Sequence, residues 1–226
     1  MDKHYAYLLI DICTILFPLA LSFDKKVAFY KQWKNLKWGM ILTGELFLSW
    51  DIIFTRHGVW SFNDNYITGY KLGGLPIEEW LFFVVVPYSC AFIYACLRTN
   101  PPFNKKPDKG RGILLVTGVL LTIAGLIFHS KAYTFSSFTF CGIAAVLVVL
   151  FHKYLPAFRA DVFLLTFLIS LIPFFIVNGL LTSLPIVIYN NKQNLGIRLY
   201  TIPVEDVFYG MLLMLGNIVS LKERQV

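Results

Sequence analysis

Residues 75–83 read Leu-Pro-Ile-Glu-Glu-Trp-Leu-Phe-Phe, and residues 202–209 read Ile-Pro-Val-Glu-Asp-Val-Phe-Tyr. Each stretch holds a proline, one apolar residue and two adjacent carboxylates, and each begins an apolar run long enough to cross a membrane. Proline suits the first turn of a helix and acidic side chains suit the positive end of the helix dipole, so both stretches predict helix starts. Carboxylate pairs are costly to bury in apolar surroundings, which indicates that the protein uses them.

The composition is that of an integral membrane protein. The 226 residues are 57% hydrophobic and 15% charged, with a mean hydropathy of +0.65. The net charge is +7, but the basic residues lie in short segments between apolar runs, so no nucleic-acid partner is expected. Seven transmembrane helices are predicted, at residues 5–23, 39–55, 77–97, 112–129, 136–151, 162–184 and 203–221.

The basic residues also predict the orientation in the membrane. The segments on one side of the predicted spans hold 14 Lys and Arg residues and those on the other side hold 6. The positive-inside rule then places the C-terminus in the cytoplasm and the N-terminus outside a cell inner membrane. The first span is not expected to be a signal peptide, because most of the nearby positive charge follows it. A polar, proline-rich linker at residues 100–110 divides the chain nearly in half.

The two acidic stretches belong to a longer internal repeat. Adding 127 to a position in the first half finds its counterpart in the second, so that Glu78 corresponds to Glu205 and Glu79 to Asp206. Further pairs at the same offset are Asp51–Asn178, Phe62–Tyr189, Asn63–Asn190, Gly69–Gly196, Lys71–Arg198 and Pro76–Pro203. With this offset, span one corresponds to span five, span two to span six and span three to span seven. Span four has no counterpart.

The repeat predicts the architecture. The expected fold is an all-α membrane protein of about seven transmembrane helices, in which two parallel three-helix repeats are joined by an extra helix. The first repeat takes residues 1–99, the linker and unpaired span take residues 100–131, and the second repeat takes residues 132–226. Because the halves have the same orientation, both acidic motifs are expected on the outer face, where they form one shared site.

Acid–base chemistry is the chemistry that these residues support. No Lys or Arg lies inside a predicted span, and a carboxyl group in apolar surroundings without a cationic partner tends to stay protonated. A protonated carboxyl beside an ionised one supplies an acid and a base in one site. Lys71 and Arg198, a few residues upstream of the motifs, are expected to hold the charge of the ionised member.

The aromatic residues around the motifs fit a cationic intermediate, because aromatic faces stabilise cations without acting as bases. An interfacial aromatic belt is the alternative interpretation. The sequence has no Gly-rich dinucleotide motif, no metal-type spacing of its four cysteines and only scattered histidines. No cofactor and no metal are therefore expected.

Several motifs carry a resemblance to a known family. They are Trp50-Asp51, Gly58-Val59-Trp60-Ser61-Phe62, Leu75-Pro76-Ile77-Glu78-Glu79 and Phe82-Phe83 in the first half, and Asn190, Gly196-Ile197-Arg198 and Ile202-Pro203-Val204-Glu205-Asp206 in the second. With these motifs the chain resembles the membrane-integral, non-flavin lycopene cyclases, which occur as two small subunits, as one fused chain, or as the cyclase domain of fungal bifunctional carotenoid enzymes. The resemblance covers essentially the whole chain, with both halves in one polypeptide.

The resemblance implies a non-redox ring closure at the end of a linear carotenoid such as lycopene, by an intramolecular lyase or isomerase. A motif carboxylic acid protonates the terminal double bond, a neighbouring double bond attacks the tertiary cation, and a carboxylate removes a proton to leave a β- or ε-ionone ring. Glu78 and Glu205 are expected as the principal acids, with Glu79 and Asp206 as base or charge partner. Supporting or substrate-binding roles are expected for Asp51, Trp60, Phe62, Lys71, Phe83, Asn190, Arg198 and Tyr209.

Partners and rival functions follow from the same features. The expected partners are a lipophilic carotenoid, the membrane, and other carotenoid-pathway enzymes or further copies of the chain. A proton-coupled transporter also explains buried acids in parallel repeats. It predicts a water-filled path, whereas a cyclase predicts an apolar tunnel that is open to lipid. A retinal protein is disfavoured because the last span has no lysine, and a prenyltransferase is disfavoured because Asn63-Asp64-Asn65 is a lone acidic motif.

Overall fold

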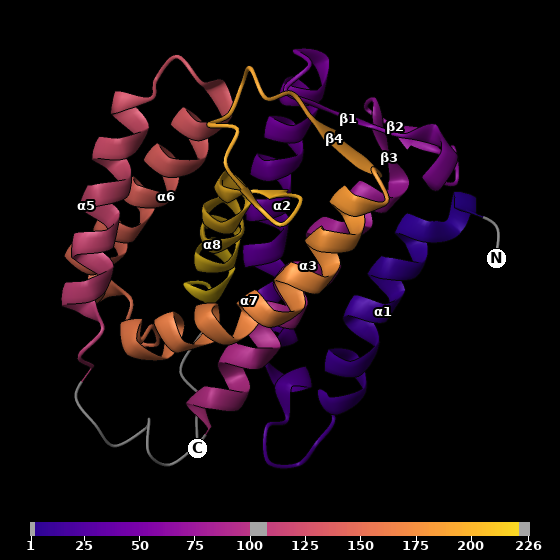
Figure 1. Ribbon diagram of the computed structural model, residues 1–226. Coiled ribbons are helices and arrows are strands. Elements are labelled where there is room, and N and C mark those ends of the chain that lie inside the picture. Colours follow the sequence, from indigo (N-terminus) through magenta and orange to yellow (C-terminus); the bar gives the residue numbers. More distant parts are fainter. Residues whose placement is uncertain (1–2, 100–107, 222–226) are drawn as a thin grey trace.

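The computed structural model describes residues 3–99 and 108–221. Within these residues the chain folds into seven α-helices, which run alternately between two ends of the molecule (Figure 1). The helices, labelled as in Figure 1, are α1 (Ala6–Leu21), α2 (Trp33–Arg56), α3 (Ile77–Arg98), α5 (Arg111–Ile127), α6 (Ala132–Leu150), α7 (Ala160–Ser183) and α8 (Val204–Ile218).

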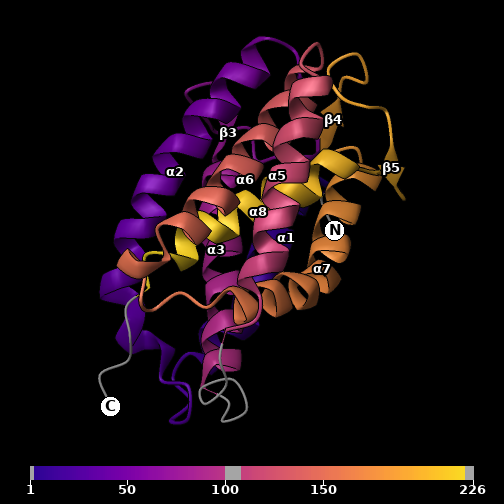
Figure 2. The same cartoon turned by 90° about the vertical axis from the view of Figure 1, so that its left-hand side faces the viewer.

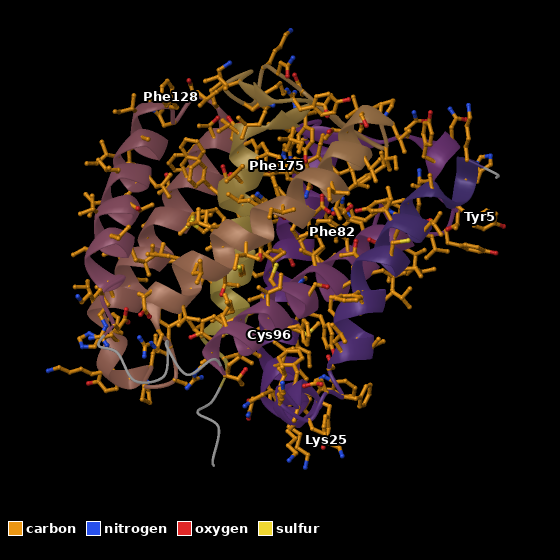
Figure 3. The ribbon with its side chains drawn as sticks, turned by 60° about the horizontal axis from the view of Figure 1, so that its bottom comes forward. Tyr5, Lys25, Phe82, Cys96, Phe128 and Phe175 are labelled. Atoms are coloured by element: carbon orange, nitrogen blue, oxygen red, sulfur yellow. The ribbon has the colours of Figure 1, made fainter. Side chains whose placement is uncertain are left out.

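The helices agree with the seven predicted spans to within a few residues, except at the start of α2. That helix begins at Trp33 instead of residue 39, so it includes Lys34 and Lys37, which the sequence analysis had placed outside any span. The extra turns hold Lys34, Asn35 and Lys37 beside apolar residues, and they lie at the end of the molecule that carries Lys25, opposite the end that carries Phe128 (Figure 3).

Large apolar side chains point away from the protein, as in a membrane protein. Phe17 and Leu42 are each 70% exposed and Ile172 is 67% exposed, which is costly in water and favourable in lipid. Four helices are long and apolar enough to cross a membrane, namely Lys3–Leu21, Ile77–Arg98, Ala132–Leu150 and Ala160–Ser183. The helix Arg111–Ile127 is apolar but shorter.

The last helix, α8, is enclosed by α2, α3, α6 and α7, and its buried face forms much of the core. The helices α5 and α6 lie side by side in both views (Figures 1 and 2). Small residues permit this contact, because a Cβ added at Gly125 would lie 2.2 Å from Oγ1 of Thr139 and one added at Gly142 would lie 2.5 Å from the carbonyl oxygen of Gly118. Glycine at these positions lets the two backbones approach closely.

The described residues are mostly helical, as predicted, but they also include six strands of two or three residues that the sequence did not predict. They are β1 (Trp60–Phe62), β2 (Lys71–Leu72), β3 (Leu75–Pro76), β4 (Val187–Tyr189), β5 (Arg198–Leu199) and β6 (Ile202–Pro203). Strands β2 and β3 form one hairpin and β5 and β6 another, with Lys71 paired to Pro76 and Arg198 to Pro203. Each proline sits at the cap position, one residue before its helix, instead of in the first turn as predicted. The strands are too short to leave a periodic pattern in the sequence.

The two halves meet at this end of the molecule. Strand β1 pairs antiparallel with β4. The backbone N–H of Asn63 donates to the carbonyl of Ile186, and the N–H of Asn190 donates to the carbonyl of Val59, each over 2.9 Å. Asn63 and Asn190 are 127 positions apart, and so are the acceptors Val59 and Ile186, so exchanging each residue for its counterpart in the other half converts the first bond into the second.

The opposite end contains the predicted linker, of which residues 100–107 lie outside the described residues. Asp108 follows them and its carboxylate accepts hydrogen bonds from the backbone N–H groups of Ala160 (2.9 Å) and Asp161 (3.0 Å), the first residues of α7. Partial burial alone would raise the pKa of Asp108, but these donors and the N–H of Gly110 outweigh burial and hold the pKa below its ordinary value. The carboxylate therefore caps α7 from a distant part of the chain.

Candidate functional site

A cavity of about 660 Å³ lies beneath the β1–β4 pair, among six helices. It is named the acid chamber here, because Asp51, Glu79 and Asp206 all face it. The other lining residues are Tyr7, Trp60, Phe62, Phe82, Val86, Tyr133, Phe174, Asn178, Leu181, Thr182, Val187, Tyr189, Tyr209, Gly210 and Leu213.

Asp51 and Glu79 are neighbouring carboxyl groups in the chamber and are called the Asp51–Glu79 pair. The indole N–H of Trp60 and, over 3.3 Å, the hydroxyl of Thr55 donate to Oδ1 of Asp51, while Tyr7 donates to Oε2 of Glu79 over 2.5 Å. Oδ2 of Asp51 is buried and has no hydrogen-bond partner among the described residues. Two buried carboxyl groups in one cavity repel each other when both are ionised, and a proton on either one relieves that repulsion.

Asp206 has a different environment. The hydroxyl of Tyr133 donates to one of its oxygens over 2.5 Å, and the hydroxyl of Tyr189 donates to the other over 2.9 Å. Burial, and then the charge of Asp206, hold the pKa of Tyr189 well above its ordinary value, so this phenol keeps its proton. Two O–H donors stabilise the carboxylate form of Asp206.

The chamber thus places the Asp51–Glu79 pair in the same cavity as Asp206, which accepts two tyrosine hydrogen bonds. Acid–base chemistry requires a proton donor and a proton acceptor within reach of one substrate, and carboxyl groups can take both roles. The pair comes from the first half of the chain and the carboxylate from the second. Asn178 stands where the repeat would place a second Asp51, and it also lines the chamber, so the halves are not chemically equivalent.

Glu78 and Glu205 do not line the chamber. Both are fully buried, and each accepts a hydrogen bond from a backbone N–H ten residues upstream, at Thr68 (2.7 Å) and Leu195 (2.8 Å). Thr134 also donates to Glu205, over 2.6 Å. These two glutamates therefore hold the motif loops against the helix starts, and their placement argues for a positioning role.

Aromatic rings form the walls of the chamber. The ring of Trp60 lies edge-to-face with those of Tyr133 (5.1 Å between centroids) and Tyr189 (6.0 Å). Tyr209 packs against Trp50 at 5.0 Å, and its buried hydroxyl has no partner among the described residues. Phe62 and Tyr209 line the cavity, as Trp60 does. The interior therefore offers several π faces around the carboxyl groups.

Four predicted supporting residues do not line the chamber, namely Lys71, Phe83, Asn190 and Arg198. Lys71 forms a surface ion pair with Asp64 at 2.7 Å, so it does not hold a motif charge as predicted. Asn190 is partly buried, and its side-chain amide donates to the carbonyl of Gly58 over 2.9 Å, which joins the two halves. Phe83 is buried in the helix core instead of lining the cavity.

Arg198 lies behind the chamber wall. Its guanidinium is 5.5 Å from the ring centroid of Tyr189 and donates to Asn191 and, over 3.4 Å, to the carbonyl of Thr201. It therefore reaches the site through Tyr189, with which it makes a cation–π contact.

The sequence analysis missed two tyrosines that contact the acids, Tyr7 and Tyr133. Each begins the first helix of its half and donates to the second acid of the motif, Glu79 or Asp206. They are 126 positions apart instead of 127, so the fixed offset did not pair them. Among the described residues no group of three or more His, Cys, Asp or Glu is arranged to hold a metal ion.

Comparison with known proteins gives one family. The family model described as lycopene cyclase matches residues 4–97 and 130–222, so it matches each half. Bifunctional lycopene cyclase/phytoene synthases of fungi are relatives. That of Neurospora crassa is 32% identical over 85 residues, which cover 34% of this chain and 14% of that protein. That of Podospora anserina is 33% identical over 93 residues, which cover 35% of this chain and 15% of that protein. The matched part is thus a small share of these longer relatives. No solved structure matches the chain significantly.

Proposed function

The chain belongs to the lycopene cyclase family, and on that premise we propose that the acid chamber closes a ring at the end of a linear carotenoid. The observation that carries the proposal is the opposition, within one cavity, of the Asp51–Glu79 pair and the tyrosine-bound Asp206. Ring closure by proton addition and proton loss is an isomerisation, so it needs an acid and a base and no redox partner.

The reaction begins with the proton shared by Asp51 and Glu79. This proton adds to the terminal carbon–carbon double bond and leaves a tertiary carbocation. The electrons of a neighbouring double bond then attack the cation and form the new carbon–carbon bond of a six-membered ring. The carbocation that results loses a proton to Asp206, which restores a double bond in a β- or ε-ionone ring. The product is an isomer of the substrate.

The surrounding residues stabilise the cationic stage. The negative charge of Asp206 and the faces of Trp60 and Tyr209 surround the place where positive charge develops. Tyr133 and Tyr189 orient the carboxylate and give up one hydrogen bond each as it takes the proton. After product release the proton returns from Asp206 to the Asp51–Glu79 pair, so the enzyme ends as it began.

We further propose that all seven helices cross the membrane and that residues 1–99 and 132–226 are parallel repeats, with α5 as the extra helix. The alternating helix directions support this arrangement, as do the two motif hairpins at one end (Figure 1). The charge bias of the loops supports an outer location for the acid chamber and a cytoplasmic C-terminus. The fungal relatives are bifunctional lycopene cyclase/phytoene synthases, which supports a role beside other carotenoid enzymes.

The proton-coupled transporter is a weaker alternative. It requires a polar path that connects the carboxyl groups with the opposite face of the membrane. The space that continues from the chamber is lined mostly by apolar side chains, which favours a lipophilic ligand over an ion.

Pigment chromatography tests the proposal. A lycopene-accumulating bacterial host expresses the chain, or a Glu79→Gln, Asp206→Asn variant that keeps the shapes of both side chains. The expected result is a monocyclic or bicyclic carotenoid with the wild type and unchanged lycopene with the variant. The proposal is overturned if lycopene is unchanged although immunoblotting finds the wild-type chain in the membrane. The retention time of the product distinguishes β from ε rings and one cyclised end from two.

A further inference from the structure

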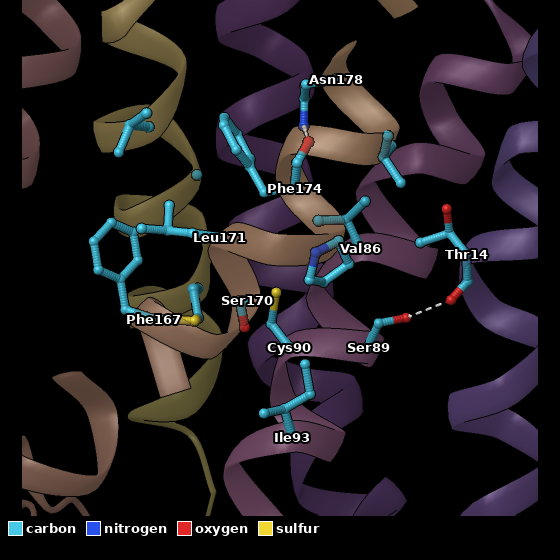
Figure 4. Close-up of a pocket in the computed structure, with 15 residues that line it drawn as sticks. Thr14, Val86, Ser89, Cys90, Ile93, Phe167, Ser170, Leu171, Phe174 and Asn178 are labelled. Carbon is cyan, nitrogen blue, oxygen red and sulfur yellow. Dashed lines mark hydrogen bonds between the residues drawn. The ribbon is translucent and has the colours of Figure 1, made fainter. Parts of the chain in front are cut away.

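A second cavity of about 580 Å³ adjoins the acid chamber, among α1, α3, α7 and α8 (Figure 4). We name it the apolar slot. Figure 4 shows Phe167, Leu171 and Phe174 of α7 on one side and Val86, Cys90 and Ile93 of α3 on the other. The proposed reaction uses none of these side chains.

The slot and the chamber adjoin each other and share part of their lining. Both are lined by Val86, Phe174, Asn178 and Gly210. Along α3 the lining continues on one helix face, from Glu79 in the chamber through Val86 to Ile93 at the far end of the slot. Fourteen residues of helix correspond to about 21 Å, so a ligand with its end at the carboxyl groups has an extended path beneath it.

The polar atoms that border the slot are mostly engaged with the protein. The hydroxyl of Ser89 donates to the carbonyls of Val85 (2.7 Å) and Thr14 (3.1 Å), and the hydroxyl of Thr14 donates to the carbonyl of Ile10 (2.7 Å). A ligand in the slot therefore has few hydrogen-bond partners, of which the buried and unpartnered hydroxyl of Ser170 is one, and most polar groups on it would lose their hydration without compensation. The slot selects for a ligand segment that is apolar along its length.

Two prolines help to keep this space open. Pro87 lies inside α3 and Pro173 lies inside α7, where it lines the slot. Proline removes one hydrogen bond of the helix ladder and bends the helix, and α7 is visibly bent in Figure 1. The lower part of α7 is thereby turned across the molecule, and the slot lies along this bend.

We propose that the apolar slot holds the isoprenoid chain of the substrate while the acyclic end projects past Gly210 into the acid chamber. This inference rests on the proposed function and adds the substrate's position and a requirement on its shape. The substrate is a long acyclic hydrocarbon whose segment next to the reacting end carries no polar group. A short isoprenoid with a diphosphate head does not meet that requirement.

Gly210 lies where the chamber and the slot share their lining. A Cβ added there would contact only the ring of Phe174, at 3.6 Å and 3.8 Å, so the helix itself tolerates a side chain. A leucine at this position would extend into the space that the chamber and slot share, and it would leave the carboxyl groups untouched. Phenylalanine at Cys90 would fill the slot farther from the acids.

The test measures binding separately from turnover. The Glu79→Gln, Asp206→Asn protein is purified from lycopene-accumulating cells, and the lycopene that it retains is extracted and quantified per protein. Gly210→Leu and Cys90→Phe are each added to this background. Gly112→Leu is the matched control, because Gly112 is on the exposed face of α5 with nothing within 4 Å of its added Cβ.

The expected result is that the background and the Gly112→Leu protein retain lycopene, and that both slot-filling variants lose it. If Gly210→Leu does not reach the membrane, Cys90→Phe decides the question. Full retention by a folded slot-filling variant, or no retention by the background protein, overturns the proposal. If lycopene is retained only when the slot is unfilled, but the wild type forms no ring, the apolar slot is supported and the proposed reaction is overturned. Failure of the slot proposal can therefore be told apart from failure of the proposed reaction.

Discussion

Replacing each glutamate of the first motif by glutamine separates a catalytic acid from a positioning residue. Glu79→Gln keeps an oxygen that accepts the hydrogen bond from Tyr7 and removes the proton that the pair with Asp51 supplies. Glu78→Gln keeps an oxygen that accepts the hydrogen bond from the backbone N–H of Thr68 and removes nothing that faces the cavity. The two substitutions are equal in size and adjacent in sequence.

The expected magnitudes differ widely. Loss of a general acid lowers a rate by about 10²–10⁴-fold, so Glu79→Gln is expected to reduce ring formation to that degree. Glu78→Gln preserves its contact and is expected to stay within about tenfold of the wild type, which corresponds to less than about 1.4 kcal/mol. Glu78→Ala leaves the N–H of Thr68 without its partner, at a cost of about 1–3 kcal/mol in stability.

The assay is the initial rate of cyclic carotenoid formation in isolated membranes supplied with lycopene, normalised to the amount of folded protein. A thermal unfolding curve for each variant separates lost chemistry from lost folding. The reasoning is refuted if Glu78→Gln loses as much activity as Glu79→Gln while both proteins unfold at the wild-type temperature. In that case the principal acid is the one that the sequence alone had favoured.

Three further predictions test other parts of the structure. Tyr189→Phe removes one of two donors to Asp206, worth about 1.5–3 kcal/mol for a charged acceptor, so ring formation should fall about 10- to 100-fold; an unchanged rate would exclude Asp206 as the base. Gly125→Ala forces a Cβ against Thr139, and the overpacking should cost about 1–3 kcal/mol of stability and lower the unfolding temperature. Gly112→Ala is the control. Equal unfolding temperatures for the two variants would contradict the close α5–α6 packing. Asp108→Asn tests the pH dependence of stability. The pKa of Asp108 is lower in the folded protein than in the unfolded chain, where it is about 3.9. The carboxylate therefore contributes its full stability above the unfolded pKa and loses it as the pH falls through the folded pKa. The variant should therefore unfold at a lower temperature at neutral pH and change less than the wild type when acidified; parallel curves would refute the cap on α7.

The hydrophobic pattern predicted the helices well, because long apolar runs with polar interruptions have few other solutions in a membrane. It missed the start of α2, where Lys34 and Lys37 lie on helical turns beyond the apolar run. It also missed the strands, since pairs such as β1 with β4 depend on residues about 127 positions apart. Such pairs form only after both halves have folded against each other.

For the site, the sequence located the two acidic segments but did not decide which acid of each motif faces the cavity. Successive residues of an α-helix differ by about 100° in direction, so of Glu78 and Glu79 only one can face a given cavity. Their adjacent positions carry no information about which one does. In the structure the second acid of each motif faces the chamber and the first contacts its own loop.

The sequence by itself determined the membrane class, the repeat, the helices and the two acidic helix starts, because these depend on local hydrophobicity and on spacing along the chain. Only the tertiary structure decided that Asp51 joins Glu79, that Tyr133 and Tyr189 join Asp206, and that Lys71 stays at the surface. The physical reason is that a buried carboxyl group must find its partners in space. Those partners come from helices far apart in the chain, whose rotations are set by packing and leave no local signal.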